Sequence, residues 1–308
     1  MIKKFFRQIG STVVVCLLAY SAWGCDLCGC ANGGSYFGIM PQVGRQFVGV
    51  RYRVSSFDSH LKSPMLRTQE HFQNVELWGR FYPLKRVQVL AFVPYFFNRQ
   101  TEVLSNRRFD LQGIGDMTVL ANYNLFNTFW DSTYTSHINH SLLVGGGAKL
   151  PTGRFQYDLA DPTDVANPNF QLGTGSVDFL MSVLYSMRVH NWGWNTDLTY
   201  KYNTTNADLY RFGNRLTMSS LLFYTKQIGK ATLMPNAGAY IEVAAKDINR
   251  GKTNDRTGGY VSMANAGLEI YLKKVSVGAT YQLPLFQSLS NNEIKAHARG
   301  TVHLTLMF

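Results

Sequence analysis

The chain has 308 residues, of which 45% are hydrophobic and 16% charged, and its 30 basic and 19 acidic residues give a net charge of +11. The basic residues are scattered along the sequence, which argues against a nucleic-acid-binding protein. After the N-terminus no apolar run reaches the roughly 20 residues of a membrane helix. A mean hydropathy of −0.12 still fits a membrane β-barrel, because lipid-facing and lumen-facing residues alternate and average out.

The start of the chain has the pattern of a signal peptide. Lys3 and Lys4 precede an apolar run over residues 12–20, and small residues come just before Cys25. A basic start, a short apolar stretch and a small-residue cleavage site are typical of a secretory signal. We therefore expect residues 1–24 to be removed.

The segment that follows, residues 25–45, is rich in cysteine and glycine and predicts a periplasmic tail or a plug. It contains Cys25, Cys28 and Cys30. The interpretations that stay open are lipidation of Cys25, a disulfide in the oxidising periplasm, a soft-metal site for Cu(I) or Zn(II), and a redox relay. Gly29 stands where a c-type haem motif needs histidine, which excludes a haem at this motif.

The rest of the chain consists of segments in which apolar and polar residues alternate, as in strands with one apolar and one polar face. They span residues 47–56, 71–82, 86–98, 113–125, 137–150, 176–189, 193–203, 214–226, 231–245, 259–272, 275–286 and 295–308. Short connections such as 83–85 alternate with long ones such as 99–110 and 151–172, and 126–136 is the exception.

Alternating short periplasmic turns and long external loops are typical of membrane barrels. The predicted fold class is therefore all-β: a transmembrane antiparallel up-and-down β-barrel of about 12 strands, within a range of about 10–14, built from residues 46–308. An even number of strands places both termini on the periplasmic side. The predicted location is the outer membrane.

The last segment ends the chain on an apolar face formed by Val302, Leu304, Leu306 and Phe308. An unpaired apolar edge recruits other chains, so we expect this strand to close the cylinder by pairing with the first strand. The alternative is the edge strand of a soluble sandwich. The pattern resembles the terminal strand of outer-membrane β-barrels, which the barrel-assembly machinery reads. This machinery and outer-membrane lipid are the expected partners.

The polar strand faces carry charges of both signs, which we expect to line the lumen. The candidate pore-lining residues are Arg51, Arg53, Glu76, Arg80, Asp116, Lys149, Asp178, Asp197, Arg215, Glu242 and Arg299; Arg188, Lys201, Glu269 and Lys295 are also placed inward. Two interpretations stay open: an ion-pair network that stiffens the wall, or a slightly cationic channel that favours anions or polar aromatic compounds.

Three glycine-rich stretches are more specific than this periodicity: GIGD at 113–116, GGGAKLPTG at 145–153 and LGTGSVD at 172–178. Their order resembles the outer-membrane family named after the MetA pathway of phenol degradation. The resemblance implies a β-barrel for uptake of small, often aromatic or hydrophobic compounds. The cysteine-rich N-terminus departs from the family. Asp116 and Asp178, near strand starts, either line a pore mouth or order a loop, or they hydrogen-bond to lumen cations.

An Asn-His-Ser sequence ending in His140 and Ser141 raises the alternative of a barrel-embedded hydrolase. Adjacent strand residues point to opposite faces, so this pair cannot easily form a hydrogen bond, and we expect no enzyme activity. The sequence thus predicts an outer-membrane channel or transporter for a small, aromatic or hydrophobic compound, without a cofactor and without nucleic acid. The other alternative is a barrel whose cysteine-rich tail binds a metal or a periplasmic partner.

Overall fold

The computed structural model describes residues 45–130, 138–156 and 169–308. The predicted signal peptide and Cys25, Cys28 and Cys30 lie outside these ranges, so their predicted roles stay predictions. Within the described ranges no helix is long and apolar enough to cross a membrane.

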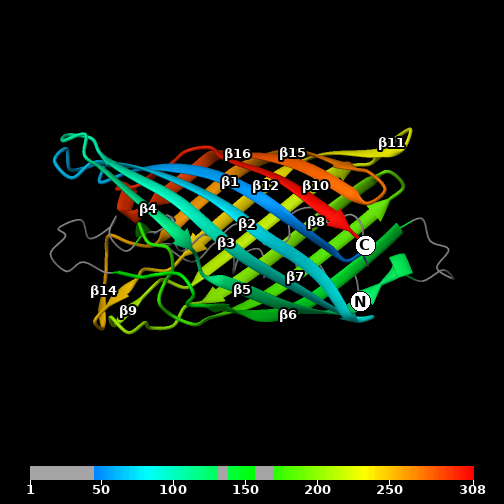
Figure 1. The fold of residues 1–308 in the computed structure, drawn as a ribbon, viewed down its shortest axis with the longest axis horizontal. Coiled ribbons are helices and arrows are strands. Elements are labelled where there is room, and N and C mark those ends of the chain that lie inside the picture. Colours follow the sequence, from blue (N-terminus) through cyan, green and yellow to red (C-terminus); the bar gives the residue numbers. More distant parts are fainter. Residues whose placement is uncertain (1–44, 131–137, 157–168) are drawn as a thin grey trace, which may run out of the picture.

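Twelve long antiparallel strands form one closed β-barrel (Figure 1). Each pairs with its neighbours in chain order, and the last strand closes the cylinder against the first. The strands are β1 (Phe47–Ser59), β2 (Thr68–Leu84), β3 (Val87–Glu102), β5 (Met117–Asn127), β6 (Ile138–Leu150), β7 (Asp178–Val189), β8 (Trp192–Tyr202), β10 (Arg215–Tyr224), β12 (Ala231–Ala244), β15 (Gly259–Tyr271), β16 (Val275–Leu289) and β18 (Arg299–Met307). The predicted fold class is confirmed.

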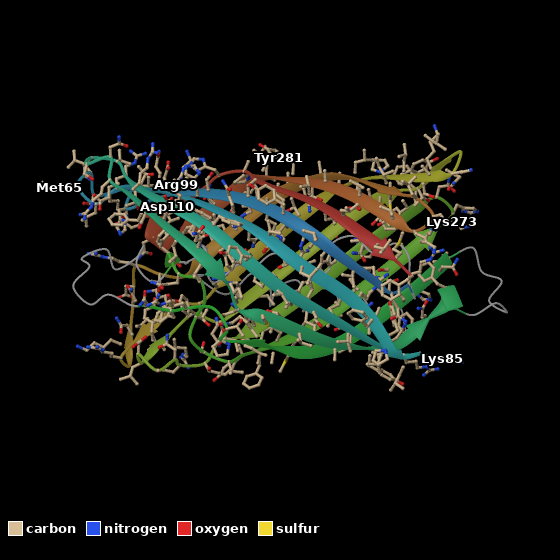
Figure 2. The ribbon with its side chains drawn as sticks, in the orientation of Figure 1. Met65, Lys85, Arg99, Asp110, Lys273 and Tyr281 are labelled. Carbon is tan, nitrogen blue, oxygen red and sulfur yellow. The ribbon has the colours of Figure 1, made fainter. Side chains whose placement is uncertain are left out.

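The two ends of the barrel differ. The turn end carries the tight connections at 84–87, 189–192 and 271–275 together with the C-terminus (Figure 1). Arg45 lies at the same end, where its NH1 donates to Lys273 O at 3.1 Å. The loop end carries the long connections, and Figure 2 shows Met65 at this end and Lys273 at the turn end. The loop end also holds a small sheet of β9 (Tyr210–Arg211), β13 (Ile248–Asn249) and β14 (Lys252–Thr253).

The outer face of the barrel is apolar. On β1, Val48 and Val50 are 36% and 47% exposed, whereas Arg51, which points inward, is 4% exposed. The predicted outward set on and beside β18 is exposed as well: Val302, Leu304, Leu306 and Phe308. A closed sheet satisfies every backbone pair inside the wall, and an apolar exterior suits contact with lipid.

The lumen is more apolar than the sequence analysis assumed. A turn-end cluster of buried side chains comprises Phe47, Trp78, Leu90, Phe92, Leu120, Leu143, Leu180, Leu184, Phe223, Met234, Tyr271 and Met307. A loop-end cluster comprises Phe57, Phe72, Tyr240, Ala244, Val261, Met263, Leu289, Ile294 and Ala296. Along β1 the inward residues run from Phe47 through Arg51 and Arg53 to Phe57. On this strand a charged zone therefore lies between two apolar layers.

Three predicted boundaries were wrong. The segment 99–110, expected to be a loop, is mostly a hairpin of β3 with β4 (Arg108–Ile114). The predicted strand over 113–125 breaks at Gly115 and Asp116. The last segment is split into β17 (Lys295–Ala296) and β18, and Lys295 is exposed instead of pointing into the lumen. The remaining short elements are β11 (Lys226–Ile228) and the 3-10 turns η2 (Thr128–Trp130) and η3 (Ser290–Asn292).

Candidate functional site

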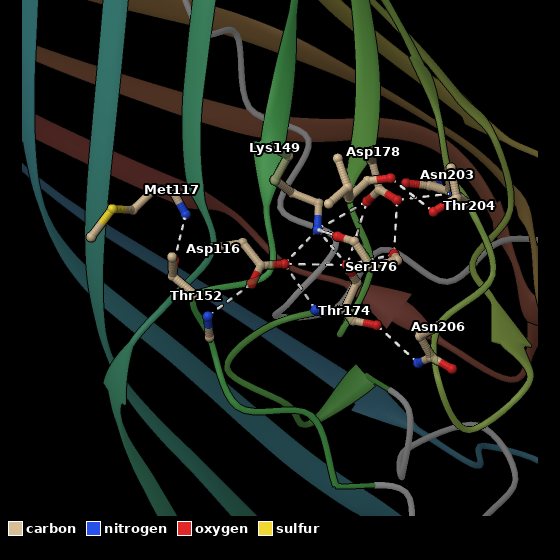
Figure 3. A network of polar contacts seen from close by, with 12 residues as sticks. Asp116, Met117, Lys149, Thr152, Thr174, Ser176, Asp178, Asn203, Thr204 and Asn206 are labelled. Carbon is tan, nitrogen blue, oxygen red and sulfur yellow. Dashed lines mark hydrogen bonds and ion pairs between the residues drawn. The ribbon is translucent and has the colours of Figure 1, made fainter.

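The three glycine-rich stretches, far apart in sequence, meet at the ammonium group of Lys149 (Figure 3). Lys149 Nζ pairs with the Asp116 carboxylate and donates to the Thr174 hydroxyl. It lies 2.9 Å from Asp178 Oδ2 and 3.3 Å from the Ser176 carbonyl oxygen. Because all five residues are buried, this is a desolvated ion-pair network whose charges depend on one another.

A break in the wall places Asp116 in this network. Pro94 on β3 has no N–H to offer, and opposite it the chain leaves β4 and enters β5 through Gly115 and Asp116. Gly115 N donates to the Pro94 carbonyl at 2.9 Å. The carboxylate of Asp116 then accepts from the backbone N–H groups of Gly153 and Thr174, each at 2.9 Å. These bonds tie the long β6–β7 connection to the start of β5.

The hydroxyl of Thr152 continues the wall where β6 has ended at Leu150. Its Oγ1 accepts from Met117 N at 2.9 Å and donates to Gly115 O at 2.7 Å. In a continuous strand pair, a backbone N–H and C=O would make these two bonds. A Cβ on Gly153 would meet the backbone of the opposite loop segment at 172–173, so glycine is needed there for close approach. The residues Pro-Thr-Gly of the second stretch thus form a clamp over the break.

Asp178 is the first residue of β7 and is fully buried. Its Oδ1 accepts from Ser176 Oγ at 2.8 Å and from Thr204 N at 3.0 Å. Asn206 Nδ2 in turn donates to Thr174 O at 2.9 Å. Both predicted carboxylates therefore order loops and also bind a lumen cation, so the two interpretations given for them are not exclusive.

A second ion-pair group surrounds Glu76. Arg51 is hydrogen-bonded to its carboxylate, and Arg53 NH2 lies 3.8 Å from the same oxygen. The guanidinium of Arg51 also lies over the rings of Trp78 and Phe92, at 4.8 and 5.6 Å from their centroids. One carboxylate thus serves two arginines, and the nearer arginine is further stabilised by cation–π contacts.

A third group surrounds Glu242, which is fully buried. Its carboxylate lies 3.0 Å from Arg215 NH1 and 3.6 Å from Arg299 NH1, and it accepts from the Tyr240 hydroxyl at 2.7 Å. As at Glu76, two arginines share one acid. Among the described residues, these lumen ion-pair groups contain more cations than carboxylates.

An open cavity in the barrel interior lies beside the first two groups, and its empty volume of about 490 Å³ includes space that is open to solvent. Its lining residues are Arg53, Asn74, Glu76, Phe92, Pro94, Phe96, Asp116, Thr118, Lys149, Leu172 and Lys201. One wall is apolar and comes mainly from β3, and the other carries charges from β1, β2, β6 and β8. A concave space with an apolar surface and a few convergent polar groups is typical of small-molecule sites.

The cavity contains only part of the predicted site. Arg53, Glu76, Asp116 and Lys149 line it. Their role as pore-lining residues stays a prediction. The remaining candidates lie elsewhere in the barrel interior. Arg299 is half-buried, and the others are buried: Arg51, Arg80, Asp178, Asp197, Arg215 and Glu242. Arg80 points to the turn end, where its Nε donates to Arg45 O at 2.9 Å.

The apolar wall of the cavity was not predicted from the sequence. Phe92, Pro94 and Phe96 point inward from β3 while Val93 and Tyr95 point outward. The sequence of β3 is apolar on both faces, whereas an ordinary barrel strand has a polar lumen face. This departure is the feature from which the wall could have been predicted.

The structure separates the two residues considered for hydrolysis. Ser141 is buried on the inner face of β6, whereas the ring of His140 lies 5.0 Å from that of Phe126 and 6.4 Å from that of Tyr185. They do not form a serine–histidine pair. In the part of the chain described here, no three His, Cys, Asp or Glu side chains are arranged to hold a metal ion.

A closed antiparallel barrel with an apolar belt and a charged interior defines the class: an outer-membrane-type β-barrel, for which an outer-membrane location follows from the fold. The model of the family described as "Putative MetA-pathway of phenol degradation" matches residues 76–284. That match spans more than half of the sequence, so the chain belongs to this family. The resemblance inferred from the three glycine-rich stretches is confirmed.

A solved structure of an outer membrane channel shares the fold. An outer membrane channel from Pseudomonas putida F1 is 14% identical, with a TM-score of 0.61 over 89% of this chain and 98% of that one. The β domain of the Bordetella autotransporter BrkA is 9% identical, with a TM-score of 0.48 over 86% and 100%. The NanC porin is 10% identical, with a TM-score of 0.44 over 85% and 99%. No curated protein matches the chain.

Proposed function

We propose that this protein is an outer-membrane channel that carries a small, partly apolar compound through its lumen. The cavity beside β3 is the observation that carries this proposal, because it offers both an apolar wall and charged groups inside the barrel. Membership of the family and the likeness to a solved outer membrane channel support a channel role. We further infer that the turn end faces the periplasm and the loop end the cell exterior.

The apolar lumen layers favour a compound with its own apolar surface over a freely hydrated ion. The turn-end cluster draws side chains from ten of the twelve barrel strands, so a solute that leaves the cavity in that direction meets aliphatic and aromatic side chains. A small aromatic or hydrophobic compound loses less hydration there than a polar one of equal size.

Reconstitution into liposomes tests the proposal. Labelled small aromatic solutes should enter liposomes that contain the folded protein faster than liposomes that contain heat-unfolded protein. Thr118→Phe adds bulk inside the cavity and should slow entry several-fold. Thr253→Phe, at an exposed position of β14, is the matched control and should leave entry unchanged.

Equal entry with folded and heat-unfolded protein would overturn the channel proposal. Equal entry with Thr118→Phe and wild type would remove the cavity from the path. Both variants must show wild-type β-sheet circular dichroism before their rates are compared.

A further inference from the structure

We propose that the lumen cavity binds a small aromatic carboxylate, with its ring against the β3 wall and its carboxylate between Arg53 and Lys201. This inference rests on the proposed channel function and names the class of compound. It starts from two features of the cavity that fit different halves of one molecule. One is an apolar wall. The other is a pair of cations: Arg53, which shares its carboxylate with Arg51, and Lys201, which has no ion pair among the described residues.

The apolar wall consists of alternate residues of β3. Phe92 and Phe96 are 2% and 4% exposed and point inward on either side of Pro94. Phe92 is also stacked on Trp78, with 6.5 Å between ring centroids and 17° between ring planes, which holds its ring in place. Two phenylalanines flanking a proline give a surface against which a planar ring can lie edge-on or offset.

The charged wall has three cations, and only one of them is neutralised at close range. Lys149 is bound by two carboxylates, those of Asp116 and Asp178. Arg53 approaches Glu76 only to 3.8 Å, and that carboxylate already binds Arg51.

Lys201 is the other cation that lacks a close carboxylate. It is 5% exposed, lines the cavity and forms no ion pair with any residue within the described ranges. Its cross-strand neighbour on β10 is Arg215, another cation. Burial and a neighbouring like charge disfavour the ammonium form of a lysine, and an incoming anion stabilises that form.

The ligand chemistry follows from both walls together. An arginine accepts a carboxylate through two parallel N–H donors, and a lysine ammonium adds a point charge. A neutral phenol leaves both cations uncompensated, and acetate leaves the phenylalanine wall uncovered. A compound with one ring and one carboxylate presents a matching group to each of the two walls.

The test is equilibrium binding of benzoate, phenol and acetate to the full mature protein in detergent, read by isothermal titration calorimetry. Wild type should bind benzoate at least tenfold more tightly than phenol or acetate. Lys201→Met and Arg53→Gln should each weaken benzoate binding about tenfold and change phenol binding by less than about twofold. Lys226→Met, at an exposed position of β11, is the matched control for loss of one lysine.

Phe96→Ala completes the design, because it removes part of the ring wall and should weaken benzoate and phenol alike. Benzoate binding no tighter than phenol in wild type, or unchanged benzoate affinity in both charge variants, would overturn the inference. Liposome entry of neutral aromatic solutes separates the two proposals. If these solutes enter but the protein shows no preference for benzoate in the binding assay, the channel proposal stands and the proposed ligand class is rejected. Absence of entry rejects the channel itself. Each variant must retain the β-sheet circular dichroism of the wild type.

Discussion

At the scale of single residues, Lys149 joins three segments of the chain at the point where the pairing of β5, β6 and β7 ends. Its ammonium binds Asp116 from the break before β5 and Asp178 from the start of β7. A buried pair adds little net stability when intact, but removing one partner leaves the others charged and desolvated.

Lys149→Met is therefore expected to destabilise the barrel by about 3–5 kcal/mol, since two carboxylates lose their shared cation in a buried site. Unfolding of the detergent-solubilised protein in urea, followed by circular dichroism, measures the change. Lys226→Met removes a lysine from an exposed position and should change the free energy of unfolding by less than about 0.5 kcal/mol. A Lys149→Met protein as stable as the control would show that Lys149 does not hold the segments together.

Thr152 offers a finer test, because its hydroxyl makes two bonds to the backbone of the break. Thr152→Val keeps the shape and removes both, so we expect a loss of about 1–3 kcal/mol. Thr152→Ser keeps the hydroxyl and should lose less. If valine and serine cost the same in urea unfolding, the methyl group and not the hydroxyl is what matters at this position.

At the scale of elements, the closure of the barrel depends on the register of β18 against β1. Val50 pairs with Leu304 and Tyr52 with Val302, and the outward side chains would move to the lumen face if the register slipped by one residue. The double variant Val50→Cys with Leu304→Cys should therefore form a disulfide on mild oxidation, read as a mobility shift on non-reducing gels.

The pair Val50→Cys with Val302→Cys is the matched control, since it is displaced by two positions along β18 and should crosslink poorly. Efficient crosslinking of the displaced pair, with little at the direct pair, would contradict the register. The wild-type cysteines at the N-terminus are replaced by serine in both double variants, so that only the introduced pair can form a disulfide.

The elements also show what sequence can and cannot predict. The outward stripe that includes Val48 and Val50 repeats every second residue because one solvent, lipid, imposes it along the whole strand. The lumen imposes no such rule, so Phe92 and Phe96 went unrecognised. The break at Asp116 depends on Pro94, a residue on another strand, and such a cause is invisible in a single alternating pattern.

Like the fold, the candidate site was predicted in part from the sequence. The residues of the three glycine-rich stretches were singled out together, and Asp116 and Lys149 do lie in one network. The three stretches meet at one ammonium group because their strands are neighbours in the up-and-down barrel. The barrel was predicted, but this meeting point was not inferred from it. Lys201 was placed inward but left out of the site, because its distance from the carboxylates is a property of the fold.

At the scale of the whole molecule, the two ends of the barrel differ in charge. The described residues of the turn end carry basic side chains and no acidic side chain: Arg45, Lys85, Arg86, Arg188, Lys226, Lys230, Lys273 and Lys274. The loop end mixes both signs, as in the exposed pair of Arg99 with Asp110 (Figure 2). Exposed lysines at each end can be replaced by cysteine to label that end selectively.

Labelling of intact cells tests which end faces outward. Lys252→Cys, at an exposed position of β14 in the loop end, should react with a membrane-impermeant maleimide in intact cells. Lys274→Cys, exposed at the turn end, should react only after the outer membrane is permeabilised, because we expect that end in the periplasm. The wild-type chain provides the blank for its own cysteines. Labelling of Lys274→Cys but not of Lys252→Cys in intact cells would reverse the inferred orientation. A solute entering from outside would then reach the turn-end cluster first, instead of the loop-end cluster.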